Sequence, residues 1–235
     1  MTIEVSKNGT VRAVRAACLM GLLGLVSGCS WVGFPGRETF VSSYQPSNVY
    51  REEKTLPSEI KRVAILPLAI GESTTELEHG RDSLAAVLNA ELVRSHQFET
   101  VLVSPERLLR ITGTARWSSS DRLADNFFDQ LAGELGVQAV MLPELTQYRA
   151  HEPLAIGWRL KLVDAAEPRV IWAVDELFDA RVPSVAAAAR RYAEGHPDTA
   201  QSVASERAVL QSPRRFARYT ASAVVATLPP RELKN

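Results

Sequence analysis

The chain has 235 residues, of which 46% are hydrophobic and 23% charged, and its 27 basic residues equal its 27 acidic residues in number. This composition is typical of a globular protein and excludes a collagen-like, low-complexity or wholly disordered chain. The formal charge of zero argues against nucleic-acid binding, because neutralising phosphates requires clustered Lys and Arg. No stretch reaches the roughly 18 to 20 apolar residues that a membrane-spanning helix needs.

The first 28 residues have the pattern of a secretory signal. A basic flank precedes a short apolar run over residues 16–26, and this order marks a cleavable signal peptide. The basic residues of the flank are Lys7, Arg12 and Arg15. The run ends in Val26-Ser27-Gly28-Cys29, which resembles the lipobox of bacterial lipoproteins. The alternative interpretation is that residues 16–26 form a buried core helix and that Cys29 is an ordinary buried thiol.

The lipobox resemblance implies that Cys29 receives diacylglycerol and becomes the first residue after cleavage. Each buried acyl methylene contributes roughly 0.8 kcal/mol, so an anchor of two or three acyl chains is expected to hold stably. Ser30 stands where an aspartate retains many lipoproteins in the inner membrane, so the resemblance implies an outer-membrane lipoprotein facing the periplasm. Cleavage would also remove Cys18, which leaves no free thiol for catalysis or metal binding.

Residues 29–57 are expected to form a lipid-anchored tether, because prolines recur and no helical or alternating period persists. The segment is nevertheless rich in aromatic residues for a linker. They are Trp31, Phe34, Phe40, Tyr44 and Tyr50. These side chains are expected to lie at the lipid interface, on the domain or on a neighbouring subunit.

Residues 58–182 are predicted to form an α/β domain. Short apolar runs predict strands at residues 62–70, 100–103, 137–148, 154–163 and 170–178. Apolar spacing and capping residues predict helices at residues 80–94, 105–111 and 118–135. The last three strands are joined by short connections and predict an antiparallel meander. The order of elements predicts one mixed sheet of about five strands covered by helices.

Residues 183–235 are predicted to be a C-terminal helical extension. One helix is expected over residues 183–194, and another begins at Ser212-Pro213 and stops at Pro229-Pro230. This extension and the aromatic tether are the candidates for a surface that contacts partners or further copies of the chain.

The sequence predicts no catalytic, cofactor-binding or metal-binding residue. The four histidines are isolated and have no metal-ligand spacing, and phosphate-loop and nucleophile-elbow motifs are absent from the sequence. The histidines are His79, His96, His151 and His196. Two groups of acids, Glu76 with Glu78 and Asp175 with Glu176 and Asp179, are either general acids and bases or merely solvated.

Two further patterns each leave two interpretations open. Trp158 and Trp172 form either a ligand platform or part of the core, and their strand positions favour the core. The basic residues Arg190-Arg191, Arg214-Arg215 and Arg218 either meet anionic lipids or acidic partners or are solvated helix faces.

The order of elements over about residues 60–180 resembles a known periplasmic group. The resemblance rests on the segments Val63-Ala64-Ile65-Leu66-Pro67, Phe98-Glu99-Thr100-Val101, Leu135-Gly136-Val137-Gln138-Ala139-Val140 and on the meander with Trp172. The group comprises the domain shared by the N-terminal part of TolB, the curli secretion lipoprotein CsgG, the exopolysaccharide lipoprotein PelC and the peptidoglycan-synthase activator LpoB. The resemblance implies a non-enzymatic adaptor or ring-forming subunit anchored in the outer membrane.

The sequence therefore predicts a structural or adaptor subunit of a cell-envelope machine, serving secretion, polysaccharide export or another envelope-spanning assembly. Its expected partners are the membrane, through the lipid anchor, and envelope proteins or further copies of itself. The alternative is a monomeric periplasmic binding module, or an activator of a cell-wall enzyme. A buried polar cluster beside Trp158 or Trp172 would favour the binding module.

Overall fold

The computed structural model describes residues 44–196 and 208–231, which fall within one compact unit of the chain. The predicted signal peptide, Cys29 and the first part of the predicted tether lie outside the described residues.

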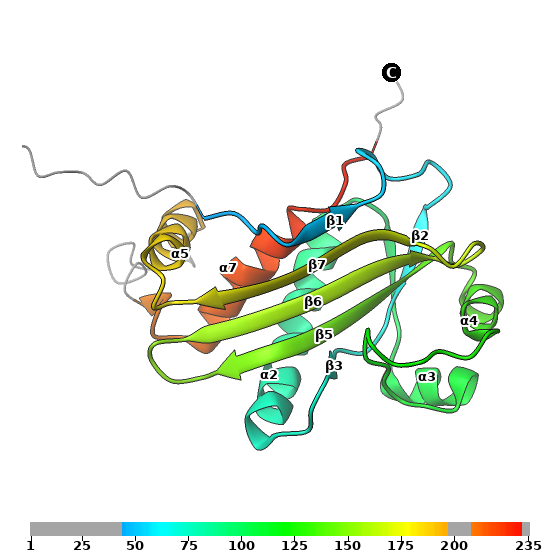
Figure 1. Cartoon of the computed structure of the whole chain (residues 1–235), viewed down its shortest axis with the longest axis horizontal. Coiled ribbons are helices and arrows are strands. Elements are labelled where there is room, and N and C mark those ends of the chain that lie inside the picture. Colours follow the sequence, from blue (N-terminus) through cyan, green and yellow to red (C-terminus); the bar gives the residue numbers. More distant parts are fainter. Residues whose placement is uncertain (1–43, 197–207, 232–235) are drawn as a thin grey trace, which may run out of the picture. The chain divides into compact units, whose positions relative to one another are not determined.

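A seven-stranded mixed sheet forms the framework of the described domain (Figure 1). The strands are β1 (Val49–Arg51), β2 (Arg62–Ile65), β3 (Ala69–Ile70), β4 (Glu99–Leu102), β5 (Ala139–Arg149), β6 (Ala155–Asp164) and β7 (Val170–Asp179). Their order is β1-β7-β6-β5-β2-β4, and β3 pairs with β5. The predicted meander is confirmed, since β5, β6 and β7 are antiparallel neighbours, whereas β2 runs parallel to both β4 and β5.

The predicted mixed α/β sheet is confirmed, but it has seven strands where the sequence predicted about five. One additional strand arises because the predicted strand at residues 62–70 is interrupted at Pro67 and continues along β5 as β3. Proline has no N–H to donate to a ladder, which accounts for the break. The other additional strand, β1, comes from the segment that was expected to be tether.

Residues 44–57 pack on the domain, so the boundary expected between tether and domain needs correction. β1 adds to the edge of β7, with Tyr50 opposite Ala173. The ring of Tyr44 packs edge-on against Phe178 with centroids 5.4 Å apart, and Leu56 is buried. Pairing of β1 covers peptide groups that β7 would otherwise expose, which is the physical reason for the difference.

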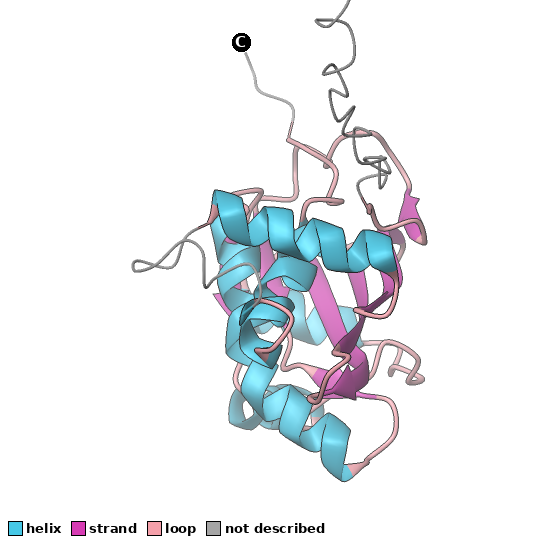
Figure 2. Ribbon diagram, turned by 90° about the vertical axis from the view of Figure 1, so that its left-hand side faces the viewer, coloured by secondary structure: helices cyan, strands magenta, loops and turns pink. Residues whose placement is uncertain are grey.

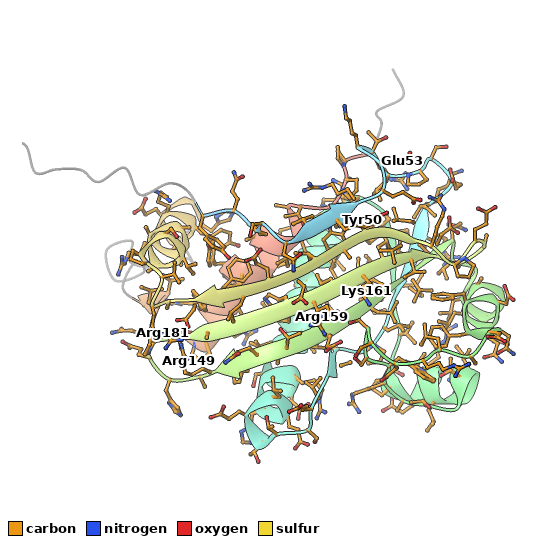
Figure 3. All side chains as sticks on the ribbon, in the orientation of Figure 1. Tyr50, Glu53, Arg149, Arg159, Lys161 and Arg181 are labelled. Atoms are coloured by element: carbon orange, nitrogen blue, oxygen red, sulfur yellow. The ribbon has the colours of Figure 1, made fainter. Side chains whose placement is uncertain are left out.

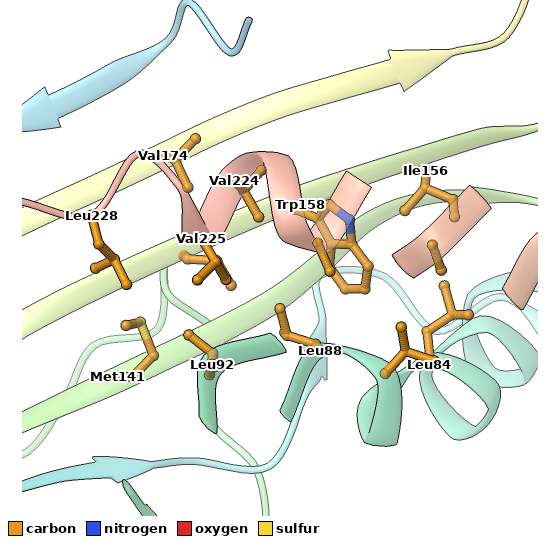
Figure 4. Close-up of a cluster of buried hydrophobic side chains, with 14 of the residues drawn as sticks. Leu84, Leu88, Leu92, Met141, Ile156, Trp158, Val174, Val224, Val225 and Leu228 are labelled. Atoms are coloured by element: carbon orange, nitrogen blue, oxygen red, sulfur yellow. The ribbon is translucent and has the colours of Figure 1, made fainter. Parts of the chain in front are cut away.

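Three helices cover one face of the sheet: α2 (Thr75–Arg94), α5 (Pro183–Gly195) and α7 (Pro213–Val225) (Figure 2). Figure 4 shows the centre of this main core, where leucines of α2 and valines of α7 meet Met141, Ile156 and Trp158 of the sheet. α2 begins at Thr75, before the predicted residue 80, because the Thr74 side chain caps it by accepting from the Leu77 N–H.

Two shorter helices, α3 (Pro105–Thr112) and α4 (Phe127–Leu135), lie on the opposite face over the end of the sheet formed by β2, β4 and β5 (Figure 1). Their buried residues form a second core with the sheet. It includes Leu108, Phe127, Leu131, Val140 and Leu142. α3 has the predicted Ser104 cap and ends at Gly113, whose φ of 77° suits glycine.

The C-terminal helix α7 is part of the main core and not an appended surface. Phe216, Ala217 and Val224 on this helix are fully buried, and α7 packs against both α2 and the sheet. The sequence marked the start of the helix correctly at Ser212, whose side chain accepts from the Arg215 N–H. The apolar side of α7 is therefore buried inside the fold, and only the exposed residues of this helix remain for contacts with partners or further copies.

Within the described residues, no helix combines the length and the hydropathy that a membrane span requires.

Candidate interaction surface

Part of the sheet face that carries α3 and α4 has no described helix over it. On β6, β7 and β1, cross-strand partners share this face, because directly paired residues point to the same side of a sheet. We call this surface the open face and define it by Tyr50, Gly157, Arg159, Lys161, Ala173, Asp175 and Leu177. Figure 3 shows Tyr50, Arg159 and Lys161 along it. Tyr50 and Leu177 are 53% and 48% exposed, so the open face presents apolar as well as charged groups.

A row of ion pairs crosses the open face. Arg159 lies opposite Glu144 on one side and Asp175 on the other. Its Nη1 is 3.3 Å from Glu144 Oε1, and its Nε is 2.8 Å from Asp175 Oδ2. The guanidinium is therefore held between two carboxylates from the neighbouring strands, which balance its charge.

Glu144 anchors the loop that precedes α4. Its carboxylate is buried and Oε2 accepts from the Ser118 hydroxyl at 2.7 Å, the Ser119 hydroxyl at 2.8 Å and the Ser119 N–H at 3.1 Å. Burial raises the pKa of this carboxyl, but the serine hydrogen bonds and Arg159 outweigh that effect and lower its pKa overall. Glu144 is thus held as an anion inside the fold.

The same contacts explain why the predicted helix at residues 118–135 is too long. α4 starts at Phe127, and the serines expected to cap an earlier start bind Glu144 instead. Asp121 accepts from the Ser118 N–H at 2.7 Å and closes a local turn. A single carboxylate within the apolar strand β5 was the only sequence signal for this arrangement.

Lys161 ties the loop to the sheet from β6, because its Nζ donates to the Ser119 carbonyl at 2.6 Å. Beside it lies a shallow hollow of about 360 Å³ on the open face. The hollow is lined by Asn48, Tyr50, Ser119, Ser120, Arg159, Lys161, Ala173, Val174 and Asp175. It combines one aromatic ring with donors and acceptors of both charges, which suits binding rather than covalent chemistry.

The acids that the sequence grouped together have separate partners. Asp175 pairs with Arg159 on the open face. Glu176 points to the other side and accepts from the Tyr44 hydroxyl at 2.6 Å. Asp179 pairs with Arg149 and Arg181, and its hydrogen bonds to Arg181 lower its pKa to about 2. These carboxylates hold the fold together and do not face one another as an acid and base pair.

The two strand tryptophans lie in the main core, as their positions favoured. Both are fully buried. Trp158 Nε1 donates to the Thr220 hydroxyl at 2.8 Å and Trp172 Nε1 to the Thr227 hydroxyl at 3.2 Å. Neither ring is available as a ligand platform, and the polar atoms beside them are satisfied by α7 and the residues that follow it.

The four histidines lie in different parts of the described chain. His79 is on α2 and His96 follows that helix with a φ of 52°, while His151 is in the connection between β5 and β6. His196 ends α5 and stacks on Tyr192 with centroids 4.2 Å apart. Among the described residues, no cluster of three or more His, Cys, Asp or Glu has the geometry to hold a metal ion.

The basic residues noted in the sequence lie on the outer parts of two helices. Arg190 and Arg191 are exposed on α5, and Arg214 is exposed on α7. Arg215 and Arg218 are partly buried and are engaged in interactions within the protein. These arginines are not gathered on the open face.

No protein-family model matches this sequence, and a search of curated proteins finds no match. Solved structures do match. A PelC dodecamer from Paraburkholderia phytofirmans is 11% identical, with a TM-score of 0.41 over 75% of this chain and 98% of that chain. The lipoprotein GNA1162 from Neisseria meningitidis is 14% identical, with a TM-score of 0.36 over 50% and 79% of the two chains. The LpoB C-terminal domain from Salmonella enterica is 15% identical, with a TM-score of 0.33 over 51% and 82%.

The chain is thus similar in structure to PelC and LpoB, which the order of elements in its sequence resembles. At these identities the likeness concerns the fold alone.

Proposed function

We propose that this protein is a non-enzymatic lipoprotein, anchored in the outer membrane through Cys29 and facing the periplasm, and that it is a structural or adaptor subunit of an envelope assembly. The open face is the observation that carries the adaptor role. The lipobox-like Val26-Ser27-Gly28-Cys29 supports the anchor. The separation of Asp175, Glu176 and Asp179 onto different partners supports a binding role over an acid and base mechanism.

The open face has the mixture of groups that protein interfaces use. Tyr50 offers a large exposed ring, and Leu177 adds apolar area on the same side of the sheet. Aromatic residues and arginine are enriched in protein interfaces, and Tyr50 and Arg159 are of these types. A partner protein or another copy of this chain that covers this face would bury both exposed apolar side chains.

The packing of residues 44–57 on the domain also limits how far the domain can lie from the membrane. Residues 30–43 separate Cys29 from Tyr44, which packs on the domain. Fully extended, this length spans at most about 50 Å at roughly 3.3 to 3.6 Å per residue. The proposed adaptor therefore acts near the inner surface of the outer membrane, closer than a tether reaching residue 57 would allow.

The test is the native mass of the lipidated protein, extracted from its own membrane in mild detergent. We expect a discrete assembly, either of several copies or with a co-purifying protein. The double variant Tyr50→Lys, Leu177→Lys should fall to a monomer with unchanged thermal stability. Val182→Lys is the matched control, because Val182 is also 44% exposed but lies outside the open face, and it should leave the assembly intact.

The anchor is tested separately. Cys29→Ser should remove the acyl mass from the intact protein and release it from the membrane fraction. Wild-type protein that carries no acyl group would contradict the anchor but leave the role of the open face standing.

The hollow on the open face favours a second candidate function, a monomeric binding module or activator. In that case the extracted wild-type protein would be a monomer with no companion. The double variant would then leave the mass unchanged, which would contradict the assembly proposal and direct attention to Tyr50, Arg159 and Lys161 as ligand contacts.

A further inference from the structure

Among the described residues, the outer edge of β4 has peptide groups with no strand beside them. The Glu99 N–H donates to the Lys61 carbonyl at 2.8 Å and the Val103 N–H to the Ile65 carbonyl at 3.0 Å. Since backbone groups alternate in direction along a strand, those of Thr100 and Leu102 point away from β2. No described strand pairs with β4 on that side. This edge therefore offers two residues whose N–H and C=O groups are ready to pair.

The residues of β4 whose peptide groups point outward, Thr100 and Leu102, are neither charged nor proline. Sheet edges are commonly blocked by lysine, proline or a covering loop. Here the outward residue Leu102 is 51% exposed, a large apolar side chain at the end of an edge strand. An exposed apolar edge of this kind is a template for a further strand.

A hollow of about 490 Å³ adjoins the β4 edge. It is lined by Pro67, Leu68, Arg81, Asp82, Ala85, Asn89, Leu102, Val103, Ser104, Pro105 and Arg116. Leu102 pairs with Ile65, whose side chain belongs to the main core, so the hollow lies on the α2 side of the strand. Alternate side chains of a strand added to β4 would project to that side, where they meet the hollow.

The lining of the hollow indicates the chemistry of its occupant. Leu68, Ala85 and Leu102 supply apolar contacts. Arg81 is already paired with Asp82 at 2.9 Å. Arg116 is exposed, so the lining of the hollow has two arginines against one acid, Asp82. Arg116 also interacts electrostatically with Asp82 and with Glu106 nearby. One apolar and one acidic side chain, two residues apart on a strand, would match these groups.

We propose that the β4 edge and its hollow bind an extended peptide segment of a partner protein, which adds to the sheet beside β4 and places an apolar and an acidic side chain against Leu102 and Arg116. Main-chain hydrogen bonds to Thr100 and Leu102 supply affinity, and the hollow supplies selectivity. This site is separate from the open face and does not depend on lipidation of Cys29, so the two proposals fail independently.

The probe is the fluorescent peptide acetyl-Thr-Glu-Val-Leu-Val-Thr-amide, titrated against the full chain in mild detergent and followed by anisotropy. Two peptides serve as controls: one carries Lys in place of Glu, and the other is N-methylated at its central Val and Leu. Losing the main-chain hydrogen bonds should weaken binding about tenfold or more, and reversing the charge should weaken it severalfold.

Leu102→Pro tests the edge in the protein, since it removes an outward N–H without touching the ladder to β2. Val49→Pro is the matched control at the opposite edge. The pairing of Glu52 N–H with Ile171 and of Asp175 N–H with Asn48 leaves the Val49 N–H pointing outward. Leu102→Pro should abolish binding and Val49→Pro should not. Arg116→Glu, which leaves the strand intact, should weaken binding of the Glu peptide and strengthen binding of the Lys peptide.

Three results would overturn the proposal. One is the absence of saturable binding up to about 1 mM peptide. Another is equal binding of the N-methylated and unmodified peptides. The third is a homo-oligomer that Leu102→Pro dissociates while no peptide binds, which would assign the edge to pairing between copies of this chain.

Discussion

The indole Nε1 of Trp158 donates to the hydroxyl of Thr220 at 2.8 Å, joining the centre of β6 to the middle of α7. The Thr220 hydroxyl in turn donates to the Ala217 carbonyl at 3.1 Å, so its orientation is determined by its own helix. Trp172 and Thr227 repeat the arrangement at 3.2 Å. Each buried indole thus has a partner near the C-terminus, which makes α7 a necessary layer of the fold.

Thr220→Val should leave the shape of this contact nearly unchanged but leave the Trp158 N–H unpaired in the core. A buried donor without a partner costs about 1 to 3 kcal/mol, so we expect a loss of that size in the free energy of unfolding measured in urea. Thr220→Ser retains the hydroxyl and should recover the hydrogen-bond part of the loss. Because Thr220→Ser also removes a buried methyl group, the deciding comparison is with the wild type: a Thr220→Val variant as stable as the wild type would show that the hydrogen bond contributes nothing.

Deleting residues 212–235 should unfold the domain. The deletion exposes the main core, because α7 covers it with Phe216, Ala217 and Val224, all fully buried. We expect loss of the cooperative thermal transition and rapid proteolysis, monitored by circular dichroism and limited digestion. A folded domain that merely fails to assemble would contradict this prediction and return α7 to the role of an interaction surface.

Gly80→Ala should destabilise the protein although the glycine is in a helix. An added Cβ would lie 2.6 Å from Tyr148 Cγ and 2.8 Å from a Leu145 methyl, because α2 approaches β5 closely there. Overpacking of this kind costs typically about 1 to 3 kcal/mol. Gly133→Ala on α4 is the matched control, since its Cβ would meet nothing within 4 Å and should stabilise by about 0.5 to 1 kcal/mol. Urea unfolding of both variants would separate the two effects.

The Asp179 carboxylate should contribute to stability in a pH-dependent way. Its pKa of about 2 lies below its ordinary value of 3.8, so the contribution is present above about pH 4 and is lost as the pH falls towards 2. Because Arg181 is 66% exposed, water screens the pair and we expect about 1 kcal/mol. The measurement is the difference in unfolding free energy between wild type and Asp179→Asn, from pH 6 to pH 2. A difference that does not shrink on acidification would contradict the assignment.

Elements that local chemistry specifies could be predicted from the sequence. Alternation around Arg159 and Lys161 identified β6, and serine caps followed by proline identified the starts of α3 and α7. The mixed sheet and the core positions of Trp158 and Trp172 also followed from pattern. These signals depend on neighbours along the chain, which is why one sequence sufficed to read them.

Features that depend on partners distant in sequence became clear from the folded protein alone. The hydroxyls of Ser118 and Ser119 donate to Glu144 and do not cap a helix. Residues 49–51, which were expected in the tether, pair with β7 as a strand of the sheet. The apolar side of α7 is buried in the main core. The two short helices α3 and α4 cover only part of their face of the sheet, so the open face has no described helix over it. In each case a long-range contact outweighs a local preference of about 1 kcal/mol. Which long-range contact forms cannot be predicted from the residues that are neighbours in sequence.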